Sequence, residues 1–207
     1  MMIAMGQSRR RGHAARVGAA VAAAVLAAGC SAGSPPDDER TPTAESAALR
    51  VQTVSGAERL DEQTRTKVEG AVGEVLSDYV VGAFLGEFPR QEFVRSFESF
   101  TSGAARDAAR DIDLLTAATV SDATAVRATD LGARLSFLTQ GGDVHGGTAK
   151  VHFAFEATME DGSTRPLVLD GRFLLDADEE TWSIFGYDVR FDDGDRTDAE
   201  AESGGGT

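Results

Sequence analysis

The sequence contains one cysteine, Cys30, and lacks the short motifs that mark several enzyme classes. One thiol cannot form an intramolecular disulfide, so this cross-link is excluded from the fold. The chain has neither a phosphate-binding loop nor a dinucleotide-binding glycine fingerprint, and no serine lies in a nucleophile elbow between a strand and a helix. These absences argue against P-loop nucleotide hydrolases, Rossmann dehydrogenases and elbow-type serine hydrolases.

Positive charge is also scarce, because 20 lysines and arginines stand against 34 acidic residues, a formal net charge of −14. Residues 1–29 hold four of the arginines and no acidic residue, so the remainder of the chain carries −18. Proteins bind nucleic acids by neutralising phosphates with Lys and Arg, and basic patches attract them to anionic lipid. We therefore expect no nucleic-acid partner, and attachment to a membrane would need something other than net surface charge.

An apolar run of 13 residues, 17–29, follows the N-terminal arginines Arg9, Arg10, Arg11 and Arg16. A basic segment, a short apolar stretch and small residues before a cleavage point are the parts of a secretory signal peptide. The run is too short to span a membrane, which takes about 20 apolar residues in a helix. We therefore predict that residues 1–29 are a signal peptide.

The residues "LAAGC" at 26–30 resemble the lipobox of bacterial lipoproteins. In that family the cysteine thiol receives a diacylglycerol, and cleavage leaves the cysteine as the first residue. The commonest form has leucine three residues before the cysteine, where this chain has Ala27 and places Leu26 one residue further back. The resemblance implies lipidation of Cys30 and a lipid-anchored location on the extracytoplasmic side of the cell membrane. A free structural cysteine is the alternative.

Few residues are suited to holding a metal. With Cys30 acylated, only His145 and His152 remain beyond the signal peptide, which excludes a zinc site of the usual Cys/His type. Carboxylates cluster at 176–180 and 192–195, but neither cluster has the glycine and terminal glutamate of an EF-hand loop. We predict no metal and no cofactor. His145, in a glycine-rich turn, and His152, on the polar face of a strand, are expected to be surface histidines rather than general bases.

Composition divides the rest of the chain into a tether, a domain and a tail. Residues 30–54 comprise Cys30 and a flexible tether rich in Pro, Ser, Thr and acidic residues, although 49–54 also fit a short strand. Residues 193–207 are acidic, end in glycines and are expected to be disordered. Residues 55–192 are long enough for one domain with a sizeable core.

The first half of this domain has a helical period. Apolar residues along 68–84 recur at helical spacing and predict one long amphipathic helix. Pro89 is expected to begin a second helix, and Thr101 or Ser102 to cap a third. The buried stripe of the second helix is predicted to be Phe93, Phe97 and Phe100.

After Thr119 the period becomes two, which predicts four strands joined by tight turns. Residues 149–159 alternate most clearly, with the apolar side chains on one face, and Gly132 is expected to mark a bulge in the preceding strand. The predicted fold class is α+β: three N-terminal helices packed on a curved four-stranded antiparallel sheet, a cystatin-like cone.

This element order over about residues 60–192, with its ending "TWSIFGYDV", resembles the nuclear transport factor two-like superfamily, which includes SnoaL-like and ketosteroid-isomerase-like proteins. The resemblance implies a ligand space between the sheet and the first helix, and a homodimer formed through the outer face of the sheet. Isomerase relatives hold a carboxylate base and a Tyr or acid donor in that space. Tyr79 and Asp188 are the candidate ligand-binding residues here, with a core tyrosine as the simpler interpretation of Tyr79.

No family catalytic residue can be placed on the chain, so the sequence favours a binding domain over an enzyme. The expected function is that of a lipid-anchored extracytoplasmic binding or accessory domain for an envelope protein or a small apolar ligand. The alternative is a SnoaL-like isomerase or cyclase, and a third hypothesis is a purely structural envelope protein.

Overall fold

The computed structural model describes residues 46–194 except 59, 91 and 179–180. The predicted signal peptide, Cys30, most of the tether and residues 195–207 of the tail lie outside the described residues. Contacts between Cα atoms divide the chain into residues 1–42 and 43–207, and every described residue belongs to the second unit. None of the helices in this described part is long and apolar enough to cross a membrane.

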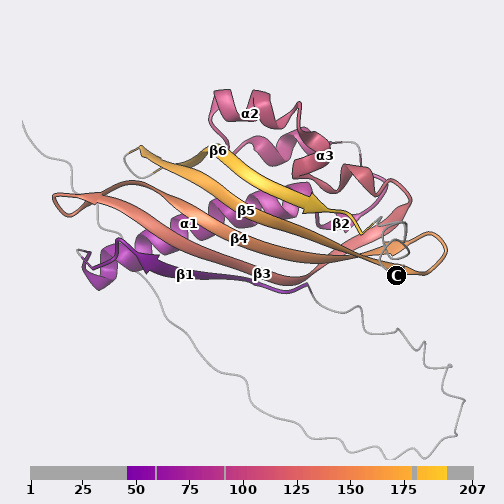
Figure 1. Ribbon diagram of the computed structural model, residues 1–207, viewed down its shortest axis with the longest axis horizontal. Coiled ribbons are helices and arrows are strands. Elements are labelled where there is room, and N and C mark those ends of the chain that lie inside the picture. The colour runs from indigo at the N-terminus through magenta and orange to yellow at the C-terminus, as the bar shows by residue number, and fades with distance from the viewer. Residues whose placement is uncertain (1–45, 59, 91, 179–180, 195–207) are drawn as a thin grey trace, which may run out of the picture. The chain divides into compact units, whose positions relative to one another are not determined.

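A six-stranded sheet forms the framework of this unit (Figure 1). Its central order is β1-β3-β4-β5-β6, and the short β2 pairs separately with β3. Strands β3 to β6 form an antiparallel meander, whereas β1 runs parallel to β3. The strands are β1 (Leu49–Ser55), β2 (Gly86–Glu87), β3 (Ala123–Gln140), β4 (Asp143–Met159), β5 (Thr164–Asp178) and β6 (Thr181–Asp192).

Helix α1 (Glu62–Ala83) runs behind the sheet in Figure 1 and contacts both β1 and β6. Asp61 caps its N-terminus, because the Asp61 carboxylate accepts a hydrogen bond of 2.8 Å from the Thr64 amide. The apolar stripe predicted from the sequence is buried, which confirms the amphipathic helix. Its buried residues are Val68, Val72, Leu76, Tyr79, Val80 and Ala83.

Short helical segments connect α1 to β3: η1 (Phe93–Phe97), α2 (Ser102–Ala108), α3 (Ile112–Leu115) and η2 (Ala117–Thr119). Thr101 caps α2, which confirms one of the two predicted caps. The second helix expected from Pro89 is only a 3₁₀ segment, because the chain then extends to pair with β6. There the Thr101 amide donates to the Ile184 carbonyl oxygen at 2.9 Å. The three predicted phenylalanines are nevertheless buried.

The predicted arrangement of three N-terminal helices on a four-stranded antiparallel sheet is wrong. Strand β1 precedes the helices and pairs in parallel with β3, from Leu49 opposite Leu131 to Thr53 opposite Leu135. With β2 added, the sheet is six-stranded and mixed, and the folded part begins before residue 55. Local periodicity identifies a strand, but it does not reveal which distant strand it pairs with or in which direction.

The bulge expected at Gly132 is also wrong. Gly132 pairs regularly with His152. The register of β3 against β4 shifts elsewhere, at Ala123/Ala125, Ala128/Asp130 and Leu138/Thr139. Glycine in a strand often marks a bulge, but it can also leave space beside neighbouring side chains. Gly132 leaves such a space on the face of the sheet that is turned away from α1.

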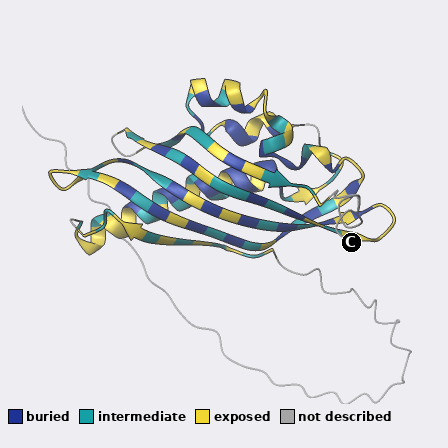
Figure 2. Ribbon diagram, in the orientation of Figure 1, coloured by how far each residue is buried: buried dark blue, intermediate teal, exposed yellow. Residues whose placement is uncertain are grey.

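Burial alternates along the strands and divides the sheet into two faces (Figure 2). The inner face packs on α1, and its β4 residues are buried as predicted. Aromatic rings from α1, the connecting segment and the strands fill this side: Tyr79, Phe84, Phe100, Phe153, Phe155 and Phe173. The outer face carries the alternate residues of β1 and β3 to β6, which are mostly exposed or half-buried.

Candidate functional site

Tyr79, a predicted ligand-binding residue, lies in the core. Its side chain is fully buried, and its hydroxyl donates to the Leu115 carbonyl oxygen at 2.6 Å. Its ring contacts those of Phe84, Phe100 and Phe173, with centroid distances of 6.1, 5.6 and 5.1 Å. Burial raises the pKa of Tyr79 well above its ordinary value, so the phenol keeps its proton.

Asp188, the second predicted ligand residue, lies on the outer face of β6. Its carboxylate accepts hydrogen bonds from Arg172 of β5, at 2.7 Å from Nη2 and 3.1 Å from Nε. Tyr79 packs against the inner face, so the structure does not bring the two side chains together. A single ligand could not contact both of them.

Both candidate histidines lie on β4, so His152 is on the polar face of a strand as predicted, whereas His145 is not in a turn. The Nδ1 atom of His152 is 2.8 Å from an oxygen of Asp170 on the outer face. His145 is exposed near the start of the strand, and no hydrogen bond or ion pair joins it to another described residue. A catalytic base is normally oriented by a neighbouring group, and His145 has no such partner in the described part of the chain.

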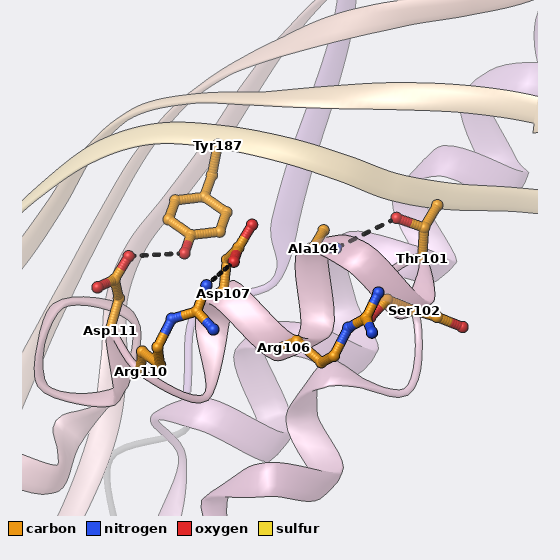
Figure 3. Close-up of polar contacts among 8 residues, drawn as sticks. All are labelled: Thr101, Ser102, Ala104, Arg106, Asp107, Arg110, Asp111 and Tyr187. Atoms are coloured by element: carbon orange, nitrogen blue, oxygen red, sulfur yellow. Dashed lines mark hydrogen bonds and ion pairs between the residues drawn. The ribbon is translucent and has the colours of Figure 1, made fainter.

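Tyr187 and Asp111 form a pair that sequence analysis did not identify (Figure 3). The Tyr187 hydroxyl on β6 donates to the Asp111 carboxylate, beyond the end of α2, at 2.8 Å. Beside them Arg110 forms an ion pair with Asp107. These four residues line a groove of about 380 Å³ between α2 and β6. Tyr187 is the residue through which the sequence could have indicated this pair. It comes one residue before the predicted Asp188 and therefore lies on the opposite face of the strand.

The surroundings of Tyr187 hold its proton in place. Burial, the hydrogen bond to Asp111 and the carboxylates of Asp111 and Asp107 raise the pKa of Tyr187 well above its ordinary value, while Arg110 acts in the opposite direction. A phenol with so high a pKa is a poor general acid near neutral pH. The pair therefore joins the segment after α2 to β6, and it does not provide a proton donor tuned for catalysis.

A larger hollow, of about 500 Å³, opens between the first half of α1 and the ends of three strands. We call it the Trp182 hollow. Its apolar lining comprises Val68, Ala71, Val144, Ala177 and Trp182, and its polar lining comprises Thr64, Lys67, Asp143 and His145. In Figure 1 the turn between β3 and β4 and the start of α1 lie at the same end of the sheet. Small-molecule sites typically have volumes of roughly 300–1,000 Å³, so this hollow is of suitable size.

Trp182 is the only tryptophan of the chain, and its side chain is mostly buried at this site. It is 8% exposed, and its ring packs edge-on against Phe137 with a centroid distance of 5.9 Å. Trp182 lies in the final strand predicted from the sequence, but the local residue pattern does not indicate a site there. The hollow exists only because α1 and two strand hairpins meet at one end of the sheet.

Neither a cluster of metal ligands in the described residues nor a matching known protein indicates what the chain does. Within the described residues, no three His, Cys, Asp or Glu side chains come together as a metal site. No family model, curated protein or solved structure matches the chain. The geometry of the Trp182 hollow is therefore the main indication of function.

Proposed function

We propose that this chain is a non-catalytic binding domain that takes a small apolar or amphipathic ligand into the Trp182 hollow. We further propose that a lipid on Cys30 anchors it on the extracytoplasmic side of the cell membrane. The lining around Trp182, which combines apolar side chains with polar ones, is the observation that carries the ligand part of the proposal. The signal-like residues 1–29 and the lipobox-like "LAAGC" support the anchor.

The lining suits a ligand with an apolar chain and one polar end. Val68 and Ala71 of α1 line the hollow together with three residues of the sheet, Val144, Ala177 and Trp182. Each methylene buried there would contribute about 0.8 kcal/mol, or roughly fourfold in affinity. The polar groups of the lining could then bind the head of the ligand.

Three observations favour binding over catalysis. Tyr79 has no exposed surface. The proton of Tyr187 is engaged by Asp111. His145, the one imidazole beside the Trp182 hollow, has no orienting partner among the described residues. The enzyme alternative is supported only by the Tyr187–Asp111 pair in its groove. That the domain binds an envelope protein stays a prediction.

Titration with saturated fatty acids of increasing chain length tests the proposal, with Trp182 fluorescence as the readout. We expect a saturable change whose affinity rises about fourfold per added methylene until the hollow is full. Ala71→Phe should fill the hollow and weaken binding at least tenfold. Val81→Phe is the matched control, because Val81 lies on the same helix, is 54% exposed and does not line the hollow.

Equal binding by wild type and Ala71→Phe would contradict the proposal, as would a fluorescence change that does not saturate. If Val81→Phe weakened binding as much as Ala71→Phe, the effect would come from α1 in general and not from the hollow. Circular dichroism of each variant shows whether the fold is retained.

A further inference from the structure

A row of three cations crosses the outer face of the sheet in this strongly acidic chain. Arg134 of β3 is directly opposite Lys150 of β4, and Lys150 is directly opposite Arg172 of β5. Like charges opposite one another on antiparallel strands destabilise a sheet. Asp188 neutralises Arg172 at 2.7 Å, whereas Arg134 and Lys150 have no ion-pair or hydrogen-bond partner among the described residues.

A hollow of about 270 Å³, which we call the outer-face hollow, lies beside this row. Its charged and histidine lining comprises Arg50, Arg134, Lys150, His152 and a single carboxylate, Asp170. Gly132 also lines it, and a Cβ atom there would meet nothing closer than the His152 carbonyl oxygen at 3.8 Å. Because 3.8 Å is an ordinary van der Waals contact, a side chain would fit at position 132. The space exists because glycine has no side chain.

Acidic neighbours hold the other two basic groups of the outer-face hollow. The Nη2 atom of Arg50 lies 2.7 Å from an oxygen of Asp130. Asp170 holds the imidazole of His152 in the same way on the other side of Gly132. These contacts orient Arg50 and His152. Arg134 and Lys150 are the two positive charges at the outer-face hollow that have no neutralising group among the described residues.

We propose that the outer-face hollow binds a phosphate group through Arg134 and Lys150. Two uncompensated positive charges match the charge of about −1.5 to −2 that a phosphate monoester carries at pH 7, whereas a carboxylate would neutralise only one. A guanidinium fork and an ammonium group both donate strong hydrogen bonds to phosphate oxygens. A bound phosphate would also relieve the repulsion between Arg134 and Lys150. The outer-face hollow is on the opposite face from Trp182, so this proposal does not depend on the proposed function.

The first test is a titration of the full-length chain with inorganic phosphate at constant ionic strength, followed by amide NMR shifts. We expect saturable shifts centred on Gly132 and Lys150. The double variant Arg134→Gln, Lys150→Gln should weaken binding about 100-fold, roughly tenfold for each lost charged hydrogen bond. Gly132→Val should also abolish binding by filling the hollow, without loss of the fold.

Arg65→Gln is the matched control for this titration. Arg65 is exposed on α1, which packs on the opposite face of the sheet, and its side chain has no partner among the described residues. Binding in this variant should stay within about twofold of wild type, because an exposed charge on the other side of the sheet is screened by salt. A loss as large as in the double variant would reduce the effect to net charge and overturn the proposal.

Vesicle flotation separates two sources of the phosphate group. The full-length chain carrying Cys30→Ala is mixed with phosphatidylcholine vesicles with or without phosphatidic acid. Flotation only with phosphatidic acid, lost in the double variant, would identify a lipid headgroup, whereas binding of inorganic phosphate alone would identify a soluble phosphate compound. The proposal fails if neither binds, if Gly132→Val binds normally, or if the double variant changes only the oligomeric state.

Discussion

Tyr79 and Tyr187 are the two tyrosines of the chain, and different surroundings raise the pKa of each. Around Tyr79 the main cause is complete burial, which removes the water that would stabilise a phenolate. Tyr187 is only half-buried, and hydrogen bonding to Asp111 adds to its desolvation. At the scale of the residue, both side chains are protonated donors, so neither resembles a catalytic acid working at neutral pH.

The native chain should therefore show little tyrosinate absorbance near pH 10, where an unfolded chain is half ionised. Because the folded pKa values lie above the unfolded ones, both tyrosines contribute stability that is fully present below about pH 10 and is lost as the pH rises further. Near-ultraviolet titration of the native and urea-unfolded chain measures this difference, and Tyr187→Phe assigns the signals. A native titration that overlays the unfolded one would contradict the structure.

Two glycines in the same sheet show how elements constrain one another. Gly171 of β5 has a φ of +146°, and a Cβ atom there would lie 2.3 Å from the carbonyl oxygen of Asp188 on β6. Strand β6 can therefore approach β5 at this point only because residue 171 has no side chain. Gly132 of β3 meets nothing closer than 3.8 Å and lies beside open space.

Gly171→Ala should lower the free energy of unfolding by about 2 kcal/mol or more, from backbone strain and the forced separation of β5 and β6. Gly132→Ala is the matched control and should leave stability unchanged or raise it by about 0.5 kcal/mol, because alanine loses less conformational entropy in a strand. Urea unfolding of both variants gives the comparison. Similar losses at the two positions would show that the close approach at Gly171 does not exist.

At the scale of the whole molecule, the apolar and the charged residues of the described part occupy different sides of the sheet. The apolar side chains lie between α1 and the inner face, and the cation row crosses the outer face. Along the sequence, part of the acidic excess lies in the segments at 37–45 and 192–202. Such an acidic chain gains no general attraction to anionic membranes from its net charge, and the lipid proposed at Cys30 would supply the anchor instead.

Cys30→Ala should move nearly all of the protein from the membrane fraction to the soluble fraction after a high-salt wash, which screens charge contacts. Several acyl chains on one residue would otherwise hold it firmly, at about 0.8 kcal/mol per buried methylene. Cell fractionation measures the change, and Ser31→Ala is the neighbouring control that should stay membrane-bound. Continued membrane association of Cys30→Ala, with normal processing, would refute lipidation.

Local sequence patterns determined which segments form the main elements and which sides of them are apolar. The 3.6-residue period predicted the buried stripe of α1 from Val68 to Ala83, and the two-residue period predicted the buried face of β4. These predictions succeed because burial imposes the same period on the sequence that the backbone imposes on the side chains. The same patterns left open which partner each element packs against.

Tertiary structure alone decided the remaining features. Strand β1 pairs with β3 across about 80 residues of sequence, and the Trp182 hollow forms where α1 meets three strand ends. Arg134, Lys150 and Arg172 become neighbours only through the registers of β3, β4 and β5. Each of these arrangements depends on contacts between distant segments, and a local hydrophobic period records whether a side chain is buried but not which other side chains lie beside it.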